Sequence, residues 1–202
     1  MKIIFQNLAN LPNMVTAIGI ILTVYLNAIF IWDEPAEHHL LILLLAVGIP
    51  LTDLDGQIAR RWNMVTFEGD LLDKFRDKFF SCSIFIHFLR ELFQRSDGIW
   101  SALIKGSINI ILAIELFLLL IWIIGFVKKF DISSHWAGKA KTNFYFVAIG
   151  WWFLLEWLED LFQRELISYL YGGLIFLLFL GSVFGILSIV AYSQRRNYPK
   201  DN

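Results

Sequence analysis

The chain has little cysteine, proline or charge. Among its 202 residues are one cysteine, Cys82, and four prolines, and only 17% of the residues are charged. A single cysteine excludes a disulfide within the chain and a metal site built from cysteines. The low charge, set against 57% hydrophobic residues, excludes an ordinary soluble domain and is typical of a protein with several membrane spans.

Further absences simplify the domain organisation. The first apolar run, residues 15–32, is long enough to span a membrane and is followed by no small-residue cleavage site, so we expect no cleavable signal peptide. We find no long linker or clear internal repeat and expect a single membrane domain over residues 1–202. The runs rich in Phe and Trp suit lipid contact or helix packing, and we expect no nucleic-acid partner.

Six segments are apolar and long enough to cross a bilayer, which takes about 20 residues. They cover residues 14–32, 39–58, 71–92, 102–127, 142–160 and 167–192. Apolar residues recur at helical spacing before Pro12, which predicts a short interfacial helix at the N-terminus. The expected fold class is an all-α integral membrane protein with six transmembrane helices and this short N-terminal interfacial helix.

The connections between these segments alternate in charge. With six spans, thirteen of the 17 lysines and arginines fall on the side of the N-terminus. Positively charged connections face the cytoplasm. We therefore expect both termini, and the acidic ends of the second and third spans, on the cytoplasmic side.

Five aspartates lie at or inside the ends of the second and third predicted spans. They are Asp53, Asp55, Asp70, Asp73 and Asp77. Carboxylates at membrane depth are costly unless they are paired or bind a cation. Asp73 and Asp77 are four residues apart and share a helix face, and the short connection 61–69 can bring Asp55 to them. We therefore expect a functional site here.

Converging carboxylates repel one another unless a cation lies between them. Oxygen ligands suit Mg²⁺, Mn²⁺ or Ca²⁺ rather than zinc. Such ions commonly hold phosphates, and two of them can stabilise an in-line displacement at phosphorus. Arg60 is suited to bidentate phosphate contacts. Gly69, one turn before Asp73, lets a ligand or a neighbouring backbone approach closely.

These residues resemble the CDP-alcohol phosphatidyltransferase family, whose signature is D-x-x-D-G-x-x-A-R-x8-G-x3-D-x3-D. The chain matches seven of its positions, namely Asp55, Gly56, Ala59, Arg60, Gly69, Asp73 and Asp77. Residues 12–16 look like the family's P-N-x-x-T segment. Residues 138–142 look like the G-K-x-K-T segment of its phosphatidylglycerophosphate synthase branch.

The chain departs from the signature at its first aspartate. That position falls at Thr52, whereas the aspartate here is Asp53. On a regular helix Thr52 lies about 60° from Asp55, but Asp53 lies about 160° away. Two alternatives stay open: a local bulge or 3₁₀ turn after Pro50 restores Asp53, or Thr52 acts as a neutral ligand.

The resemblance implies transfer of a phosphatidyl group from CDP-diacylglycerol to an alcohol, with release of CMP. It implies two Mg²⁺ or Mn²⁺ ions held by Asp55, Asp73 and Asp77 together with Asp53 or Thr52. Asp77 would also be the general base. The implied nucleotide-binding residues are Gly56, Ala59, Arg60, Gly69, Asn13 and Thr16, and the implied acceptor-binding residues are Lys139, Lys141 and Thr142.

The acceptor that we favour is glycerol 3-phosphate. Where glycerophosphate-using members often have R-E in the fourth span, this chain has Ile114-Glu115, and Gly19 replaces a frequent arginine. Inositol, inositol phosphate, serine, phosphatidylglycerol or an aminoalcohol therefore stay open as acceptors. Two other classes are a catalytically weak member that binds lipid or nucleotide and a small transporter. Membrane lipid is an expected partner, and family analogy suggests a homodimer. For Glu115, deep in its span, we expect a polar contact between helices.

Overall fold

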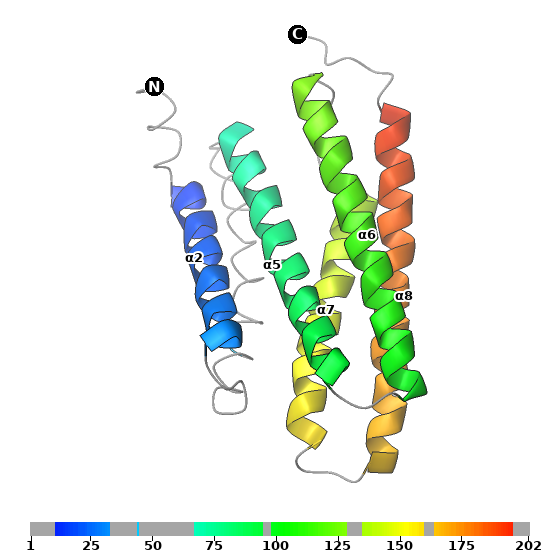
Figure 1. The fold of residues 1–202 in the computed structure, drawn as a ribbon. Coiled ribbons are helices and arrows are strands. Elements are labelled where there is room, and N and C mark those ends of the chain that lie inside the picture. The colour runs from blue at the N-terminus through cyan, green and yellow to red at the C-terminus, as the bar shows by residue number, and fades with distance from the viewer. Residues whose placement is uncertain are drawn as a thin grey trace. The chain divides into compact units, whose positions relative to one another are not determined.

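The structure is a computed structural model that describes residues 11–32, 44, 67–94, 98–128, 135–159 and 164–195. Five α-helices make up this part of the chain (Figure 1). They are α2 (Leu11–Trp32), α5 (Phe67–Gln94), α6 (Ile99–Val127), α7 (Trp136–Glu159) and α8 (Arg164–Arg195). The described part is all-helical, as the sequence predicts.

Five of the six predicted spans coincide with these helices. The predicted span 39–58, Leu44 excepted, lies outside the described residues, as do residues 1–10 of the predicted interfacial helix. Leu11 and Pro12 belong to α2 instead of preceding it. A proline is tolerated there because the first turn of a helix leaves its N–H groups without a partner inside the helix.

Three of the described helices are long and apolar enough to cross a membrane by length and composition. The stretches are Met14–Ile31, Ile99–Gly125 and Tyr169–Gln194, with mean hydropathies of 2.2, 2.6 and 2.7. Helix α5 carries charged residues from Glu68 to Lys78 and again at Arg90 and Glu91, and α7 carries them near both ends. The prediction of six spans therefore stays a prediction.

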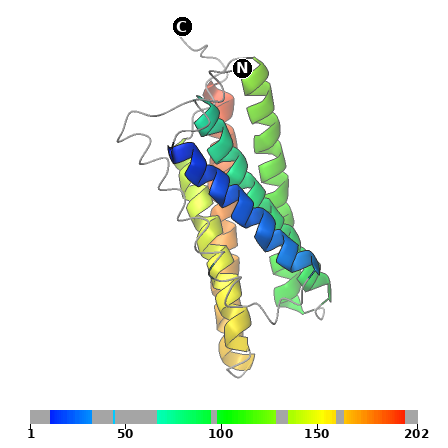
Figure 2. The same ribbon diagram turned by 90° about the vertical axis from the view of Figure 1, so that its left-hand side faces the viewer.

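Contacts along the chain divide it into two units, residues 1–87 and 88–202, with the boundary inside α5. In the first unit Asn27 and Phe30 of α2 contact α5, and Leu26 and Phe30 are buried. Asn27 Nδ2 donates a hydrogen bond to Ser83 Oγ at 3.1 Å. The Phe30 and His87 rings stack with centroids 3.7 Å apart. In Figure 2, α2 crosses in front of α5.

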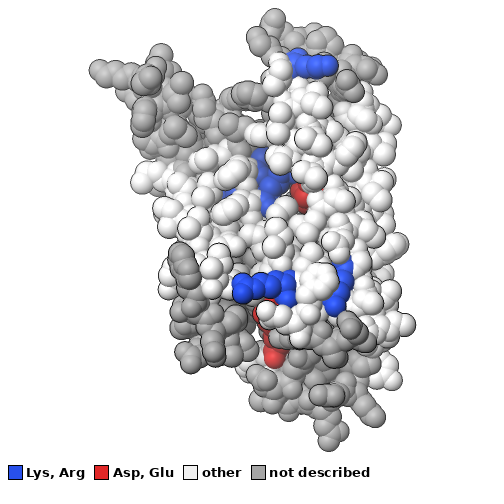
Figure 3. Space-filling view, in the orientation of Figure 1, with Lys and Arg blue, Asp and Glu red and all other residues white. Residues whose placement is uncertain are grey.

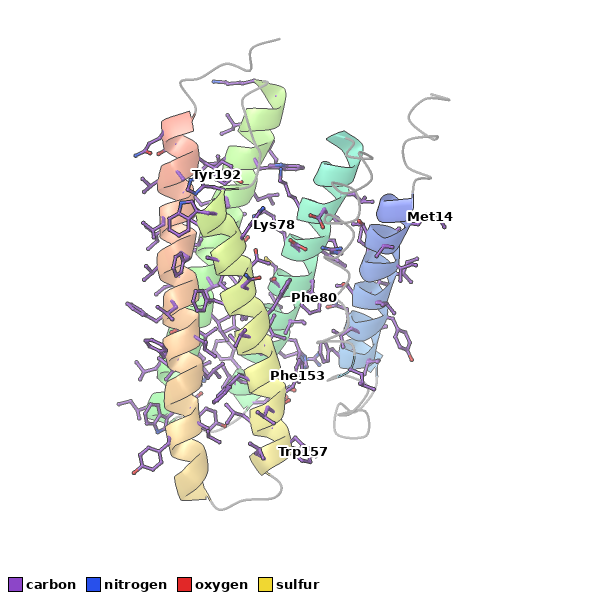
Figure 4. The ribbon with its side chains drawn as sticks, turned by 180° about the vertical axis from the view of Figure 1, so that it is seen from behind. Met14, Lys78, Phe80, Phe153, Trp157 and Tyr192 are labelled. Carbon is purple, nitrogen blue, oxygen red and sulfur yellow. The ribbon has the colours of Figure 1, made fainter. Side chains whose placement is uncertain are left out.

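The second unit contains α6, α7 and α8, and α8 packs against both of the other helices. Glycines of α8 permit this close approach. A Cβ atom at Gly181 would lie 2.7 Å from Tyr145 Cε1, and one at Gly185 would lie 2.8 Å from Ile114 Cγ2. On α7, Phe153 is buried whereas Trp157, one turn later, is exposed (Figure 4).

Many large apolar side chains lie on the outside of the described helices. Ile110, Phe117, Phe176 and Phe179 are each more than half exposed. In the face shown in Figure 3, charged atoms of the described residues occupy only a few places. Such a surface suits contact with lipid rather than water.

Candidate active site

The first turns of α5 carry the charged residues of the predicted site. The helix begins at Phe67, and Glu68 and Asp70 in its first turn are acidic, which favours a helix start there. Gly69 lies one turn before Asp73, as predicted. The same stretch continues past Lys78 to Phe80, which is buried (Figure 4).

Asp73 and Asp77 are joined by an arginine between them in the sequence. Nη2 of Arg76 donates hydrogen bonds to Asp73 Oδ1 at 2.6 Å and to Asp77 Oδ1 at 2.9 Å. The Arg76 side chain is 1% exposed, whereas those of Asp73 and Asp77 are 36% and 25% exposed. We call these three residues the α5 cluster. The structure thus brings Asp73 and Asp77 together, as their spacing predicts.

The donor set of the α5 cluster fits a hard divalent cation. Both acids offer oxygen atoms, and a carboxylate has lone pairs beyond the one that accepts from Arg76. Within the described ranges no group of three or more His, Cys, Asp or Glu side chains could hold a metal ion. The further predicted ligands, Thr52, Asp53 and Asp55, lie outside those ranges.

Three of the six predicted nucleotide-binding residues also fall outside the described part. These are Gly56, Ala59 and Arg60. Asn13 lies in the first turn of α2, where the backbone alone is described. Thr16 is buried, 2% exposed, and belongs to the same unit as the α5 cluster.

A second charged site lies between α6 and α7 in the other unit. Lys141 Nζ donates a hydrogen bond to Glu115 Oε1, and both side chains are buried. The same Nζ lies 5.4 Å from the centroid of the Tyr145 ring. We call Glu115 and Lys141 the α6–α7 pair. The prediction that Glu115 makes a polar contact between helices is confirmed.

The three predicted acceptor-binding residues do not share one face of α7. Lys139 is exposed whereas Lys141 is buried, because two residues on a helix differ by about 200° in direction. Thr142 Oγ1 donates to the carbonyl oxygen of Gly138 at 3.1 Å, within the same helix. The roles of these residues stay predictions.

Sequence reasoning assigned no role to Arg76 and no partner to Glu115. The signal for Arg76 was its charge, three residues from one acid and next to the other. The signal for the α6–α7 pair was one lysine and one glutamate inside apolar stretches, since buried charges need partners. In both cases the sequence indicates that a charged residue needs a partner, but it does not show which residue that partner is.

The sequence model of the family described as CDP-alcohol phosphatidyltransferase matches residues 9–190. The match includes all of the helices that carry the two charged sites. The chain belongs to the CDP-alcohol phosphatidyltransferase family. This confirms the resemblance that the aspartate signature predicted, and with it the enzyme class, a role in phospholipid synthesis and membership of a membrane-protein family.

Curated relatives within this family cover nearly the whole chain. A CDP-diacylglycerol--glycerol-3-phosphate 3-phosphatidyltransferase of Salmonella choleraesuis (strain SC-B67) is 25% identical over 91% of this chain and 92% of its own length. The protein of the same name from Escherichia coli (strain K12) has the same identity and coverage. One from Shigella flexneri serotype 5b (strain 8401) is 26% identical over 74% of this chain and 81% of its own length.

Proposed function

We propose that this protein transfers the phosphatidyl group of CDP-diacylglycerol to glycerol 3-phosphate, forming phosphatidylglycerophosphate and CMP. The observation that carries the proposal is the pairing of Asp73 and Asp77 on one face of α5, at the spacing of the family signature. The relatives named for this reaction support the choice of substrates.

We propose that Asp55, Asp73 and Asp77, with Asp53 or Thr52, hold two Mg²⁺ or Mn²⁺ ions, which when bound would neutralise charge on the diphosphate. Asp77 takes the proton from the acceptor hydroxyl. The oxygen of that hydroxyl then attacks the phosphorus nearer the diacylglycerol. The bond from this phosphorus to the CMP oxygen breaks, and CMP leaves with the electron pair.

The nucleotide would be bound by residues of the signature and of the start of α2. Gly56, Ala59 and Gly69 leave room for it because they are small, and Arg60 binds the diphosphate. Asn13 and Thr16 border the same pocket. The burial of Thr16, in the unit that holds the α5 cluster, supports a place for it inside the protein rather than on the surface.

We propose that Lys139, Lys141 and Thr142 bind the acceptor. Lys139 is exposed, which suits first contact with an anionic acceptor. Lys141 already donates to Glu115, so an acceptor phosphate would share its ammonium group with that carboxylate. Glu115 would thereby fix the direction in which Lys141 points.

The chain would cross the membrane six times, with both termini and the aspartates on the cytoplasmic side. The excess of lysine and arginine on that side supports this orientation. The N-terminal segment would lie along the membrane surface. A homodimer, by analogy with the family, belongs to the same proposal.

A second candidate is transfer to an acceptor without a phosphate, such as inositol, serine or an aminoalcohol. Ile114 stands where members that use glycerol 3-phosphate often have arginine. It is 6% exposed and packs against Gly185, so an apolar contact between helices occupies this position. A site with one basic residue fewer suits a less anionic acceptor.

Release of CMP from CDP-diacylglycerol by the purified protein in detergent, with Mg²⁺ or Mn²⁺, tests both candidates. Each acceptor is added separately: glycerol 3-phosphate, inositol, inositol phosphate, serine, phosphatidylglycerol and ethanolamine. We expect glycerol 3-phosphate to give the fastest release. Faster release with inositol, serine or ethanolamine, which carry no phosphate, would replace the first candidate with the second.

Two variants control this assay. Asp73→Asn should abolish release, whereas Asp70→Asn makes the same chemical change on the same helix outside the signature and should retain it. Folded protein that binds CDP-diacylglycerol but releases no CMP with any acceptor would contradict the proposed enzyme. Activity gained on inserting one residue after Asp53 would then identify the shifted aspartate as the cause.

A further inference from the structure

Arg76 is the charged residue of the α5 cluster that the family signature does not include. It is the largest of the fully buried side chains among the described residues. An arginine stays protonated in proteins, and burying its charge is costly unless acceptors surround it. Asp73 and Asp77 supply such acceptors, and the proposed metal site uses the same two acids.

The geometry of the contact resembles that of a bridging cation. A single nitrogen atom, Nη2, lies within hydrogen-bond distance of one oxygen of each carboxylate. Divalent cations bridge carboxylate oxygens at about 2.0–2.6 Å. A cation that used the same two oxygens would therefore compete with this nitrogen for them.

We propose that Arg76 is an internal counter-ion of the α5 cluster: it holds Asp73 and Asp77 together without metal and competes with a divalent cation for their oxygens. This inference rests on the proposed function, since it assumes that these acids bind the cation. Arg76 acts through the two acids and is a positioning residue.

Charge decides the sign of its effect on metal binding. Asp73, Arg76 and Asp77 together carry one negative charge, whereas the two acids alone would carry two. Repulsion between a guanidinium and a divalent cation falls only as the inverse of their distance and is weakly screened at a buried position. Neutralising Arg76 should therefore strengthen cation binding. A residue that served packing alone would weaken binding when replaced, because the acids would lose their support.

The experiment measures Mn²⁺ binding by titration calorimetry, and the melting temperature in EDTA, on full-length protein in detergent. Arg76→Gln should bind Mn²⁺ about tenfold more tightly than the natural protein. It should also melt at a lower temperature in EDTA, because Asp73 and Asp77 then repel each other, and Mn²⁺ should restore much of the loss. Neither measurement depends on turnover.

Three further variants make the result specific. Arg90→Gln makes the same substitution on α5 at an exposed position about 21 Å along the helix, and it should change neither quantity. Arg76→Lys keeps the charge and should keep the Mn²⁺ affinity within about threefold. Arg76→Met also removes the charge and replaces Arg76→Gln should that variant not fold, because its side chain suits a buried site.

Weaker or unchanged Mn²⁺ binding by folded Arg76→Gln or Arg76→Met would overturn the inference. It would not contradict the proposed metal site. Equal tightening by Arg76→Lys would overturn it too, because charge would not be the cause. Tight binding by Arg76→Gln where the natural protein binds weakly would support it strongly. Absence of binding by every variant, Asp73→Asn included, would overturn the proposed metal site and this inference together.

Discussion

The α5 cluster and the α6–α7 pair both join basic and acidic side chains, but they are built differently. The α5 cluster is local, its two acids outnumber its one base, and those acids are partly exposed. The α6–α7 pair joins residues 26 positions apart on two helices, its charges balance, and both side chains are buried. Surplus negative charge open to solvent suits cation binding and catalysis. A balanced, enclosed pair suits the fixing of one helix against another.

The largest effect on activity is expected from Asp77→Asn in the α5 cluster. The amide cannot accept the proton of the acceptor hydroxyl, so turnover should fall by about 10²–10⁴-fold. The melting temperature should fall less than in Glu115→Ala, because the buried Arg76 keeps the Asp73 carboxylate and the amide oxygen can still accept from it. CMP release and thermal unfolding of the same preparation check both statements. A loss of stability as large as that of Glu115→Ala would remove the contrast between the two sites.

Glu115→Ala should give the largest loss of stability. It leaves the Lys141 ammonium buried without its carboxylate, and breaking a buried ion pair costs about 3–5 kcal/mol. The free energy of unfolding in mild detergent measures the cost. The double variant Glu115→Leu with Lys141→Met removes both charges and should recover most of it. The single variants Glu115→Leu and Lys141→Met are measured as well. If the loss in the double variant equals the sum of the losses in these two, the residues do not stabilise each other.

The same contrast separates what the sequence predicts from what only the structure supplies. The pairing of Asp73 with Asp77 follows from a spacing of four residues on any helix. The hydrogen bonds of Arg76 to both acids do not follow from the spacing, because a long side chain can point in several directions from the same backbone. The need of Glu115 for a partner follows from its burial, but the choice of Lys141 depends on how α6 and α7 pack.

The helix ends differ from the predicted spans for a related reason. The predicted span 142–160 corresponds to α7, Trp136–Glu159, and 102–127 corresponds to α6, Ile99–Val127. Hydropathy marks the apolar part of a helix, whereas its backbone hydrogen bonds continue into charged residues such as Lys139 and Lys141. The aspartates of the second predicted span lie outside the described residues. Both alternatives for the first signature position, Asp53 restored by a local distortion or Thr52 as a neutral ligand, therefore stay open.

Gly185→Ala should give an intermediate loss of stability, because the added methyl group would clash with residues beside the α6–α7 pair. The added methyl group would meet Ile114 Cγ2 at 2.8 Å and Lys141 Cδ at 3.6 Å, and overpacking typically costs about 1–3 kcal/mol. Gly172→Ala is the matched control on α8, since a Cβ there meets nothing within 4 Å. It should be neutral or stabilise by up to about 1 kcal/mol. Equal effects of the two substitutions in detergent unfolding would show that close approach does not support the pair.

Ser83→Ala should give the smallest effect, because it removes one neutral hydrogen bond between α2 and α5. Asn27 Nδ2 donates to Ser83 Oγ and also to the carbonyl oxygen of Thr23, so Asn27 keeps an acceptor after the change. Hydrogen bonds between membrane helices average about 0.6 kcal/mol, and we expect a loss of that size in the free energy of unfolding. Ser107→Ala is the control, since Ser107 donates to Leu103 of its own helix and should cost less. A loss near that of Glu115→Ala would mean that neutral contacts hold the first unit as firmly as the charged pair holds the second.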